Sequence, residues 1–199
     1  MKRLGISVEG ATEREFVNHV LRPHFVKYDL DVTAIDIRGN VSLDKIKATL
    51  PALLGSHDYV STFYDYYGFK KREKRTVEQL EQAIHGLAEN SQKLIPYVQQ
   101  YEFEALIFAA PECAVEWMEG KEEQLTQMRH AVQQAGSPEK VNDRLETSPS
   151  HRLKKLFPRY DKKLHGPEII DLAGLDAVRS KCSRFDNWVS KLESLGSKQ

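Results

Sequence analysis

The chain has 199 residues, of which 40% are hydrophobic and 29% charged, as in globular proteins with a buried apolar core. Basic and acidic residues balance at 29 each, which argues against nucleic-acid binding through overall positive charge. No apolar run approaches the roughly 20 residues that span a bilayer, and the first residues lack the pattern of a signal peptide. With two cysteines that lack metal-ligand spacing, this composition predicts a cytoplasmic protein without a membrane partner.

The first half of the chain alternates between strand and helix patterns. Strands are expected at residues 4–8, 31–37, 59–64 and 94–98. Capping patterns at Thr12, Ser42 and Thr76 mark the starts of the intervening helices. Pro51 predicts a kink or an early stop in the second helix, and Pro96 places the fourth strand at a sheet edge. The alternation predicts an α/β fold with a four-stranded, mainly parallel sheet flanked by helices.

The second half has a different, mainly helical pattern. The third helix of the first half is expected to end near Asn90, and residues 111–135 form an acidic helical stretch. Gly136-Ser-Pro138 and Ser148-Pro-Ser150 then interrupt the chain. The last 30 or so residues give two more helical patterns. We therefore expect an α/β core over residues 1–110 and a helical extension over 111–199 that packs on it as one continuous structural unit.

Carboxylates follow the expected strands of the sheet. Glu9 comes directly after the first strand, Asp65 after the third, and Glu102 and Glu104 after the fourth. Ligands of open α/β sheets bind at the carboxyl ends of the strands, and oxygen ligands select Mg²⁺ or Mn²⁺. The pattern predicts a metal site of Glu9, Asp65 and one of the two later glutamates. The alternatives are that Asp65 caps a loop and that a glutamate favours a helix N-terminus.

Two basic segments accompany these acids. Lys70-Lys-Arg-Glu-Lys-Arg75 carries five positive charges in six residues, and six more lysines and arginines lie between His151 and His165. A phosphodiester substrate requires such cations for its phosphates. Candidate contacts are Lys70, Lys71, Arg72, Arg152 and Lys155. The alternatives are a solvated loop for the first segment and a surface ion pair for Arg152. Tyr66 and Tyr67 would stack on a base or pack in the core.

Several longer blocks together resemble one bacterial family. They are Val8-Glu9-Gly10-Ala-Thr12-Glu13, Phe63-Tyr-Asp65-Tyr-Tyr-Gly68, Glu102-Phe-Glu104-Ala-Leu-Ile-Phe108, Ser148-Pro-Ser-His-Arg152-Leu and Tyr160-Asp-Lys162-Lys-Leu-His165-Gly-Pro167. The family is domain of unknown function 4276, and the resemblance runs from residue 8 to about 190. It implies a Toprim-like Rossmannoid fold, as in primases, topoisomerases and the overcoming-lysogenisation-defect nucleases.

The same resemblance assigns roles to the acids. It implies that Glu9 matches the Toprim glutamate and that Asp65 matches the first acid of the Asp-x-Asp motif. Tyr67 stands at the second acid position, so either Glu102 or Glu104 replaces that ligand or metal binding is weakened.

The implied activity is metal-dependent hydrolysis of a phosphodiester in DNA or RNA. Glu9, Asp65 and Glu104 (or Glu102) would hold Mg²⁺ or Mn²⁺, and Lys162 or His165 would assist the phosphate or the leaving group. Members are often encoded beside an ABC-type ATPase, which implies an effector of a two-component phage-defence system. The alternatives are a catalytically inactive Toprim-like scaffold that binds an ATPase partner or nucleic acid, and another phosphotransfer chemistry. For His165 the alternative is a structural histidine before the turn Gly166-Pro167.

Overall fold

The computed structural model describes residues 1–88, 92–142 and 147–197, and its backbone contacts divide the chain into two compact units. The first unit comprises Met1–Gln99 and Trp188–Gln199, and the second comprises Gln100–Asn187. The sequence pattern places a boundary near residue 110, whereas the contacts place it after Gln99 and assign the end of the chain to the first unit. The second crossing between the units falls inside the last helix, α10 (Ser183–Glu193).

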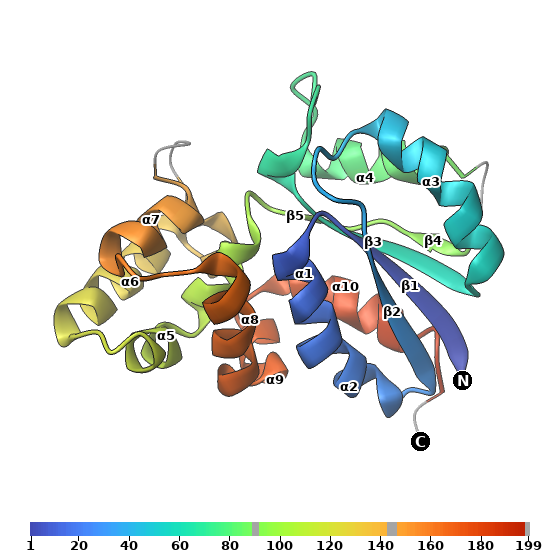
Figure 1. Cartoon of the computed structure of the whole chain (residues 1–199). Coiled ribbons are helices and arrows are strands. Elements are labelled where there is room, and N and C mark those ends of the chain that lie inside the picture. The colour runs from blue at the N-terminus through green and yellow to red at the C-terminus, as the bar shows by residue number, and fades with distance from the viewer. Residues whose placement is uncertain (89–91, 143–146, 198–199) are drawn as a thin grey trace. The chain divides into compact units, whose positions relative to one another are not determined.

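A parallel sheet forms the centre of the first unit (Figure 1). Its strands are β1 (Lys2–Val8), β2 (Leu30–Asp36), β3 (Tyr59–Asp65), β4 (Leu94–Ile95) and β5 (Val98–Gln99). The order is β2-β1-β3-β4, with β5 also paired to β3, and every pairing is parallel. The predicted α/β class with a parallel sheet is confirmed. Its central strand β3 is buried from Val60 to Asp65.

The predicted fourth strand is two short strands, because proline interrupts it. Pro96 has no N–H to donate to β3, and β4 ends at Ile95. Thr62 bridges the gap with its side chain: its Oγ1 accepts from the Tyr97 N–H at 2.9 Å and donates to the Tyr97 carbonyl at 2.8 Å. Pairing with β3 then resumes as β5. The edge position predicted from Pro96 is confirmed for β4.

Helices cover both faces of this sheet (Figure 1). On one face, α3 (Leu43–Ser56) and α4 (Val77–Gly86) bury an apolar cluster that includes Leu50, Ile84, Val60 and Tyr64. On the other face lie α1 (Ala11–Phe16), a π-helical turn over Val17–Leu21, and α2 (Arg22–Val26). Side chains alternate along a strand, so Val60 and Tyr64 of β3 serve the first face and Phe63 serves the second.

The end of the chain completes the second face. The Trp188 ring of α10 stacks on Phe63 at 5.2 Å and on Tyr97 at 4.7 Å between ring centroids. Its Nε1 donates to Ser61 Oγ at 2.8 Å, which satisfies the buried indole N–H. Farther along, Glu193 lies 2.7 Å from the His24 ring of α2. The last helix is therefore part of the core of the first unit.

The helix starts were predicted with mixed success. Ser42 accepts from the Lys45 N–H, and Thr76 and Gln79 cap each other reciprocally, as predicted. The start predicted at Thr12 is wrong, because Gly10 caps α1 and its N–H donates to the buried Glu13 carboxylate at 3.1 Å.

Two predicted helix ends also differ from the structure. An early stop at Pro51 did not occur: α3 continues to Ser56, with Leu50 and Leu53 buried on either side of the proline. Packing of an apolar face outweighs the local cost of one proline. The helix α4 ends at Gly86, and Asn90 lies outside the described residues.

A buried 3₁₀-helix, η3 (Phe103–Ala109), forms the centre of the second unit, and all its residues are buried. It contacts η4 (Pro138–Lys140), α7 (Pro149–Leu156), α8 (Lys162–Ala173) and α9 (Leu175–Arg179). The acidic stretch predicted to be helical forms α5 (Pro111–Trp117) and α6 (Glu122–Ala135). Over the described ranges of both units, no helix combines the length and apolarity needed to cross a membrane.

Candidate functional site

Acidic residues end three neighbouring strands of the sheet in the first unit. Val8, the last residue of β1, pairs with Asp36 on β2 and with Phe63 on β3. Glu9 follows Val8, Asp36 ends β2, and Asp65 ends β3. Parallel strands present these residues at one edge of the sheet. We call Glu9 and Asp65 the acidic edge.

The side chain of Glu9 reaches the turn that follows Asp65. This turn is η2 (Tyr66–Gly68), and a Cβ atom at Gly68 would overlap the Glu9 carboxylate. Glycine at this position therefore leaves room for the Glu9 carboxylate, and no unusual φ angle is involved. The Glu9 carboxylate thus lies at Gly68, in the turn that follows Asp65, and Asp65 itself is only 6% exposed.

The negative charge of Glu9 also acts on the neighbouring Tyr64. The Tyr64 hydroxyl is buried and donates to Ser7 Oγ at 2.6 Å. Burial raises the pKa of this hydroxyl, and the negative charge of Glu9 adds to the increase. The Glu9 carboxylate therefore acts electrostatically on the end of β3, in a region from which water is largely excluded.

Two further acids near this edge were not selected from the sequence. Asp36 accepts from the Arg38 N–H at 2.6 Å and lies 3.7 Å from an Arg14 nitrogen. Glu13 is 3% exposed and holds the Gly10 N–H. The position of Asp36 at the end of a predicted strand was a usable signal. The contacts of both acids fix the backbone around Glu9, which is a supporting role.

The acidic edge fits a hard divalent cation in its chemistry. Both donors are carboxylates, and Mg²⁺ is commonly held by one or two carboxylates together with water and substrate phosphates. Across the described parts of the chain, no cluster of three or more His, Cys, Asp or Glu side chains is arranged to hold a metal ion. Within the first unit, Glu9 and Asp65 are the predicted ligands that lie at this edge.

The two later glutamates belong to the second unit and have different partners. Glu102 precedes η3, and its Oε2 accepts from the Ser150 N–H in the first turn of α7 at 2.9 Å. Glu104 lies within η3, is 0% exposed, and has the Lys162 ammonium 3.6 Å from its Oε1. The structure thus brings together Glu104 and Lys162, two of the predicted catalytic residues. A buried carboxylate needs such a partner to offset its desolvation.

His165 and Arg152 make local contacts within the second unit. The His165 Nδ1 accepts from the Asp161 N–H at 3.0 Å, and its ring lies 6.0 Å from that of Tyr160. The Arg152 Nε donates to the Thr147 carbonyl at 2.8 Å. The first contact orients His165 in the first turn of α8, and the second orients Arg152 in the middle of α7.

The basic loop of residues 70–75 is folded rather than extended. The Arg72 guanidinium lies over the Tyr66 and Tyr67 rings, at 4.5 and 5.3 Å from their centroids, and donates to the Tyr66 carbonyl at 3.3 Å. Three residues of the loop have positive φ angles: Lys71 (55°), Glu73 (52°) and Lys74 (62°). Lys70 and Lys71 are exposed. The loop therefore presents lysines to solvent while Arg72 covers the tyrosines beside the acidic edge.

Comparison with known proteins identifies the family. The family described as Domain of unknown function (DUF4276) matches residues 8–193, so the chain belongs to it. The match begins at Val8, next to the acidic edge, and ends at Glu193, in the helix that returns to the first unit. No curated protein and no solved structure matches the chain significantly.

Proposed function

We propose that the protein is a metal-dependent nuclease whose acidic edge hydrolyses a phosphodiester. The observation that carries this proposal is the approach of the Glu9 carboxylate to Gly68, in the turn that begins directly after Asp65. Asp65 ends β3 and Glu9 directly follows β1, and carboxylates are the donors that a hard divalent cation prefers. The resemblance to Toprim-like proteins, in which acids at these strand ends bind metal, supports the same function.

In this proposal Glu9 and Asp65 hold Mg²⁺ or Mn²⁺. A bound divalent cation polarises a phosphoryl oxygen and lowers the pKa of water. The buried position of Asp65 keeps bulk water away and strengthens electrostatic interactions at the edge. Arg72, held over the two tyrosines, and the exposed Lys70 and Lys71 contact the phosphates of DNA or RNA.

We assign the second unit a supporting set of groups. Lys162, held by the buried Glu104, stabilises negative charge on a phosphate, and His165 assists the leaving group. Arg152 and Lys155 of α7 bind the nucleic-acid backbone. In this scheme Glu104 acts through Lys162, and Glu102 anchors α7.

The resemblance to the family also supports a cellular role. Its members are often encoded beside an ABC-type ATPase, so we propose a cytoplasmic effector of a two-component phage-defence system. In this proposal the ATPase controls the nuclease.

A second candidate is an inactive scaffold that binds the ATPase or a nucleic acid without cutting it. Tyr67 favours this alternative, because it occupies the second acid position of the Toprim motif and lies beneath Arg72. A guanidinium beside the acidic edge would then take the place of the metal's charge.

Cleavage assays distinguish the two candidates. The full chain is incubated with single- and double-stranded DNA and with RNA, with Mg²⁺, Mn²⁺ or EDTA, and with and without the neighbouring ATPase. We expect metal-dependent cleavage that Glu9→Gln abolishes and Glu15→Gln preserves, since Glu15 pairs with Arg14 and His19 rather than with the edge. Absence of cleavage in every combination, together with no metal binding by calorimetry, would leave the scaffold.

A further inference from the structure

A cleft in the second unit combines cations, amides and an apolar floor. Its volume is about 380 Å³, within the roughly 300–1,000 Å³ of small-molecule sites. It lies between α6 and α7, with Phe108 of η3 beneath them. All of these elements belong to the second unit, so the cleft does not depend on the acidic edge.

Helical spacing places the polar groups of each helix on one side. Gln127, His130 and Gln134 line the cleft from α6, at the i, i+3 and i+7 positions of one helix face. Arg152 and Lys155 line it from α7, three residues apart. Each helix thus contributes a row of side chains, and both rows line the same cleft.

The charges of the lining select an anion. Among the residues of the lining that the structure describes, Arg152 and Lys155 are the basic ones, and no aspartate or glutamate accompanies them. The bond from Arg152 Nε to the Thr147 carbonyl fixes the plane of the guanidinium. A planar guanidinium beside an ammonium is suited to the oxygens of a phosphate.

The rest of the lining suits a nucleoside. Phe108, 1% exposed, and Leu156 supply an apolar surface on which a base or ribose can pack. The amides of Gln127, Gln134 and Asn142 both donate and accept, as the edges of bases require. The Gln127 and Gln134 amides also contact Glu123 and His130 through their Nε2 atoms, at 3.2 and 3.4 Å.

We propose that this cleft binds a nucleoside 5′-monophosphate, either free or as the terminal nucleotide of a nucleic acid. The phosphate lies against Arg152 and Lys155, and the nucleoside lies between Phe108 and the amides of α6. Arg152 and Lys155 are the cations that the proposed nuclease places on the nucleic-acid backbone, and the cleft extends that role to a complete nucleotide, without a metal and without Glu9 or Asp65.

Calorimetry in EDTA tests the site without any contribution of metal at the acidic edge. The full chain is titrated with each of the four ribonucleoside 5′-monophosphates, with the nucleosides, with inorganic phosphate, and with oligonucleotides bearing a 5′-phosphate or a 5′-hydroxyl. We expect saturable binding of at least one monophosphate below about 1 mM, and weaker binding of phosphate or nucleoside alone.

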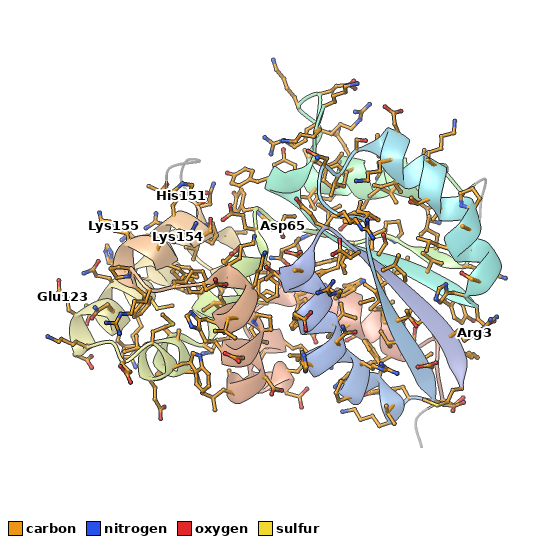
Figure 2. All side chains as sticks on the ribbon, viewed as in Figure 1. Arg3, Asp65, Glu123, His151, Lys154 and Lys155 are labelled. Carbon is orange, nitrogen blue, oxygen red and sulfur yellow. The ribbon has the colours of Figure 1, made fainter. Side chains whose placement is uncertain are left out.

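Two adjacent lysines provide a matched control. Lys154 and Lys155 are neighbours on α7 (Figure 2), and Lys155 lines the cleft whereas Lys154 does not. Lys155→Gln should weaken binding about fivefold, as expected for a partly exposed charge-assisted contact. Lys154→Gln should stay within about twofold of the wild type. His130→Gln, on α6, is a second variant that should also weaken binding.

The other possible results of these titrations either support or overturn the proposal. Binding of the 5′-phosphorylated oligonucleotide but not of monophosphates, with the same dependence on Lys155, supports a terminal nucleotide as the ligand. Equal affinity for inorganic phosphate and the monophosphates overturns the nucleotide and leaves a simple anion site. Absence of binding by any probe, or equal effects of the two lysine variants at unchanged thermal midpoints, overturns the proposal.

Discussion

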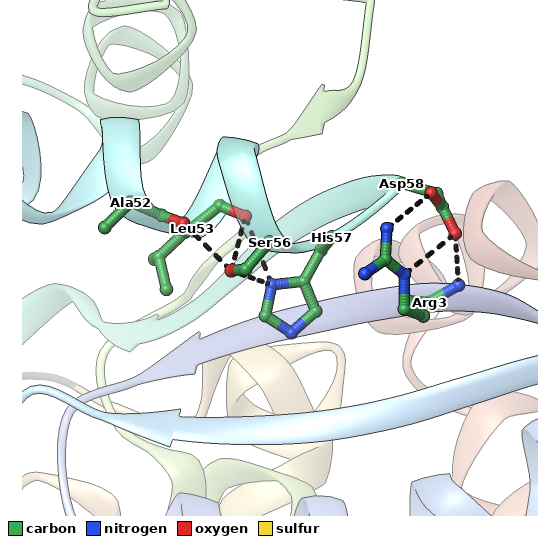
Figure 3. A network of polar contacts seen from close by, with 6 residues as sticks. All are labelled: Arg3, Ala52, Leu53, Ser56, His57 and Asp58. Carbon is green, nitrogen blue, oxygen red and sulfur yellow. Dashed lines mark hydrogen bonds and ion pairs between the residues drawn. The ribbon is translucent and has the colours of Figure 1, made fainter.

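The two ends of strand β3 carry aspartates in opposite electrostatic situations. Asp58 directly precedes the strand and bonds to Arg3 through the Arg3 N–H at 2.8 Å and a guanidinium nitrogen at 3.1 Å (Figure 3). These hydrogen bonds lower the pKa of the Asp58 carboxyl to about 2. Asp65 ends the same strand, is 6% exposed, and has the Glu9 carboxylate at the turn that follows it.

The amino end thus pairs opposite charges at the surface, whereas the carboxyl end has a buried aspartate with the half-buried Glu9 at the turn that follows it. The first arrangement is complete within the protein. In the same network His57 Nδ1 lies 2.9 Å from Ser56 Oγ and 3.1 Å from the Leu53 carbonyl (Figure 3). The second arrangement brings a carboxylate to the turn after Asp65, and carboxylates are the donors that hard divalent cations prefer. This difference indicates that a reaction would take place at the carboxyl end of β3, at Asp65, and not at the Arg3–Asp58 ion pair.

The largest expected effect on cleavage comes from replacing the aspartate at one end of β3 by asparagine and comparing it with the same change at the other end. Asp65→Asn should reduce metal-dependent cleavage at least about 100-fold, because it removes a charged ligand from the acidic edge. Asp58→Asn should leave cleavage within about twofold, because Asp58 pairs with Arg3 at the opposite end of the strand from the acidic edge. Turnover of both variants is measured on one substrate, with thermal midpoints as the folding control. Equal loss in the two variants would contradict the contrast between the ends.

A glycine substitution tests the geometry of the acidic edge without changing its charge. In Gly68→Ala the new methyl overlaps the Glu9 carboxylate, which is the end of a flexible side chain and moves aside. We expect cleavage to fall about 10- to 100-fold, because displaced catalytic groups lose much of their effect.

Gly55→Ala is the matched control, since a methyl there meets no atom within 4 Å. It should leave cleavage unchanged and slightly raise the thermal midpoint, as alanine favours a helix interior. An active Gly68→Ala protein with full metal affinity would show that the position of Glu9 is unimportant.

A substitution at Gly5 tests the region near the amino end of β3, where His57 lies. A methyl at Gly5 of β1 would lie 3.0 Å from the His57 ring, so the ring must shift. We expect Gly5→Ala to lower the free energy of unfolding by about 1 kcal/mol through overpacking and to leave cleavage unchanged. Chemical denaturation measures the first effect, and the cleavage assay measures the second.

The smallest effect concerns the acid stability of the Arg3–Asp58 pair. The pKa of Asp58 is lowered from 3.8 to about 2 in the folded protein, so the pair stabilises the fold fully above pH 4 and not below pH 2. Asp58→Asn should therefore lower the thermal midpoint slightly at pH 7, and the difference from the wild type should shrink as the pH falls from 4 to 2. A difference that is constant over this range would show that the carboxylate charge is not involved.

Much of the α/β unit follows from local patterns in the sequence. Alternation of strand and helix patterns predicted the parallel sheet, and hydroxyl residues before apolar runs predicted the caps at Ser42 and Thr76. The strand-end positions of Glu9 and Asp65 followed from the same patterns. These features depend on the conformation of a few consecutive residues, which is why a sequence reveals them.

Contacts between distant segments were decided by the tertiary structure alone. Trp188, near the end of the chain, stacks on Phe63 and Tyr97. Glu104 pairs with Lys162, whereas Glu102 accepts a hydrogen bond from the Ser150 N–H. No local pattern specifies these meetings, because each depends on how the whole chain folds back on itself.

The sequence by itself determined the class of the fold, the strand ends that carry acids, and the family. Only the tertiary structure decided that Gly68 must admit the Glu9 side chain and that α6 and α7 enclose a cleft with Lys155 but not Lys154. The physical reason is one of range. Backbone preference and hydrophobic periodicity act over a few residues, whereas close approach and shared cavities arise from packing between elements far apart in the chain.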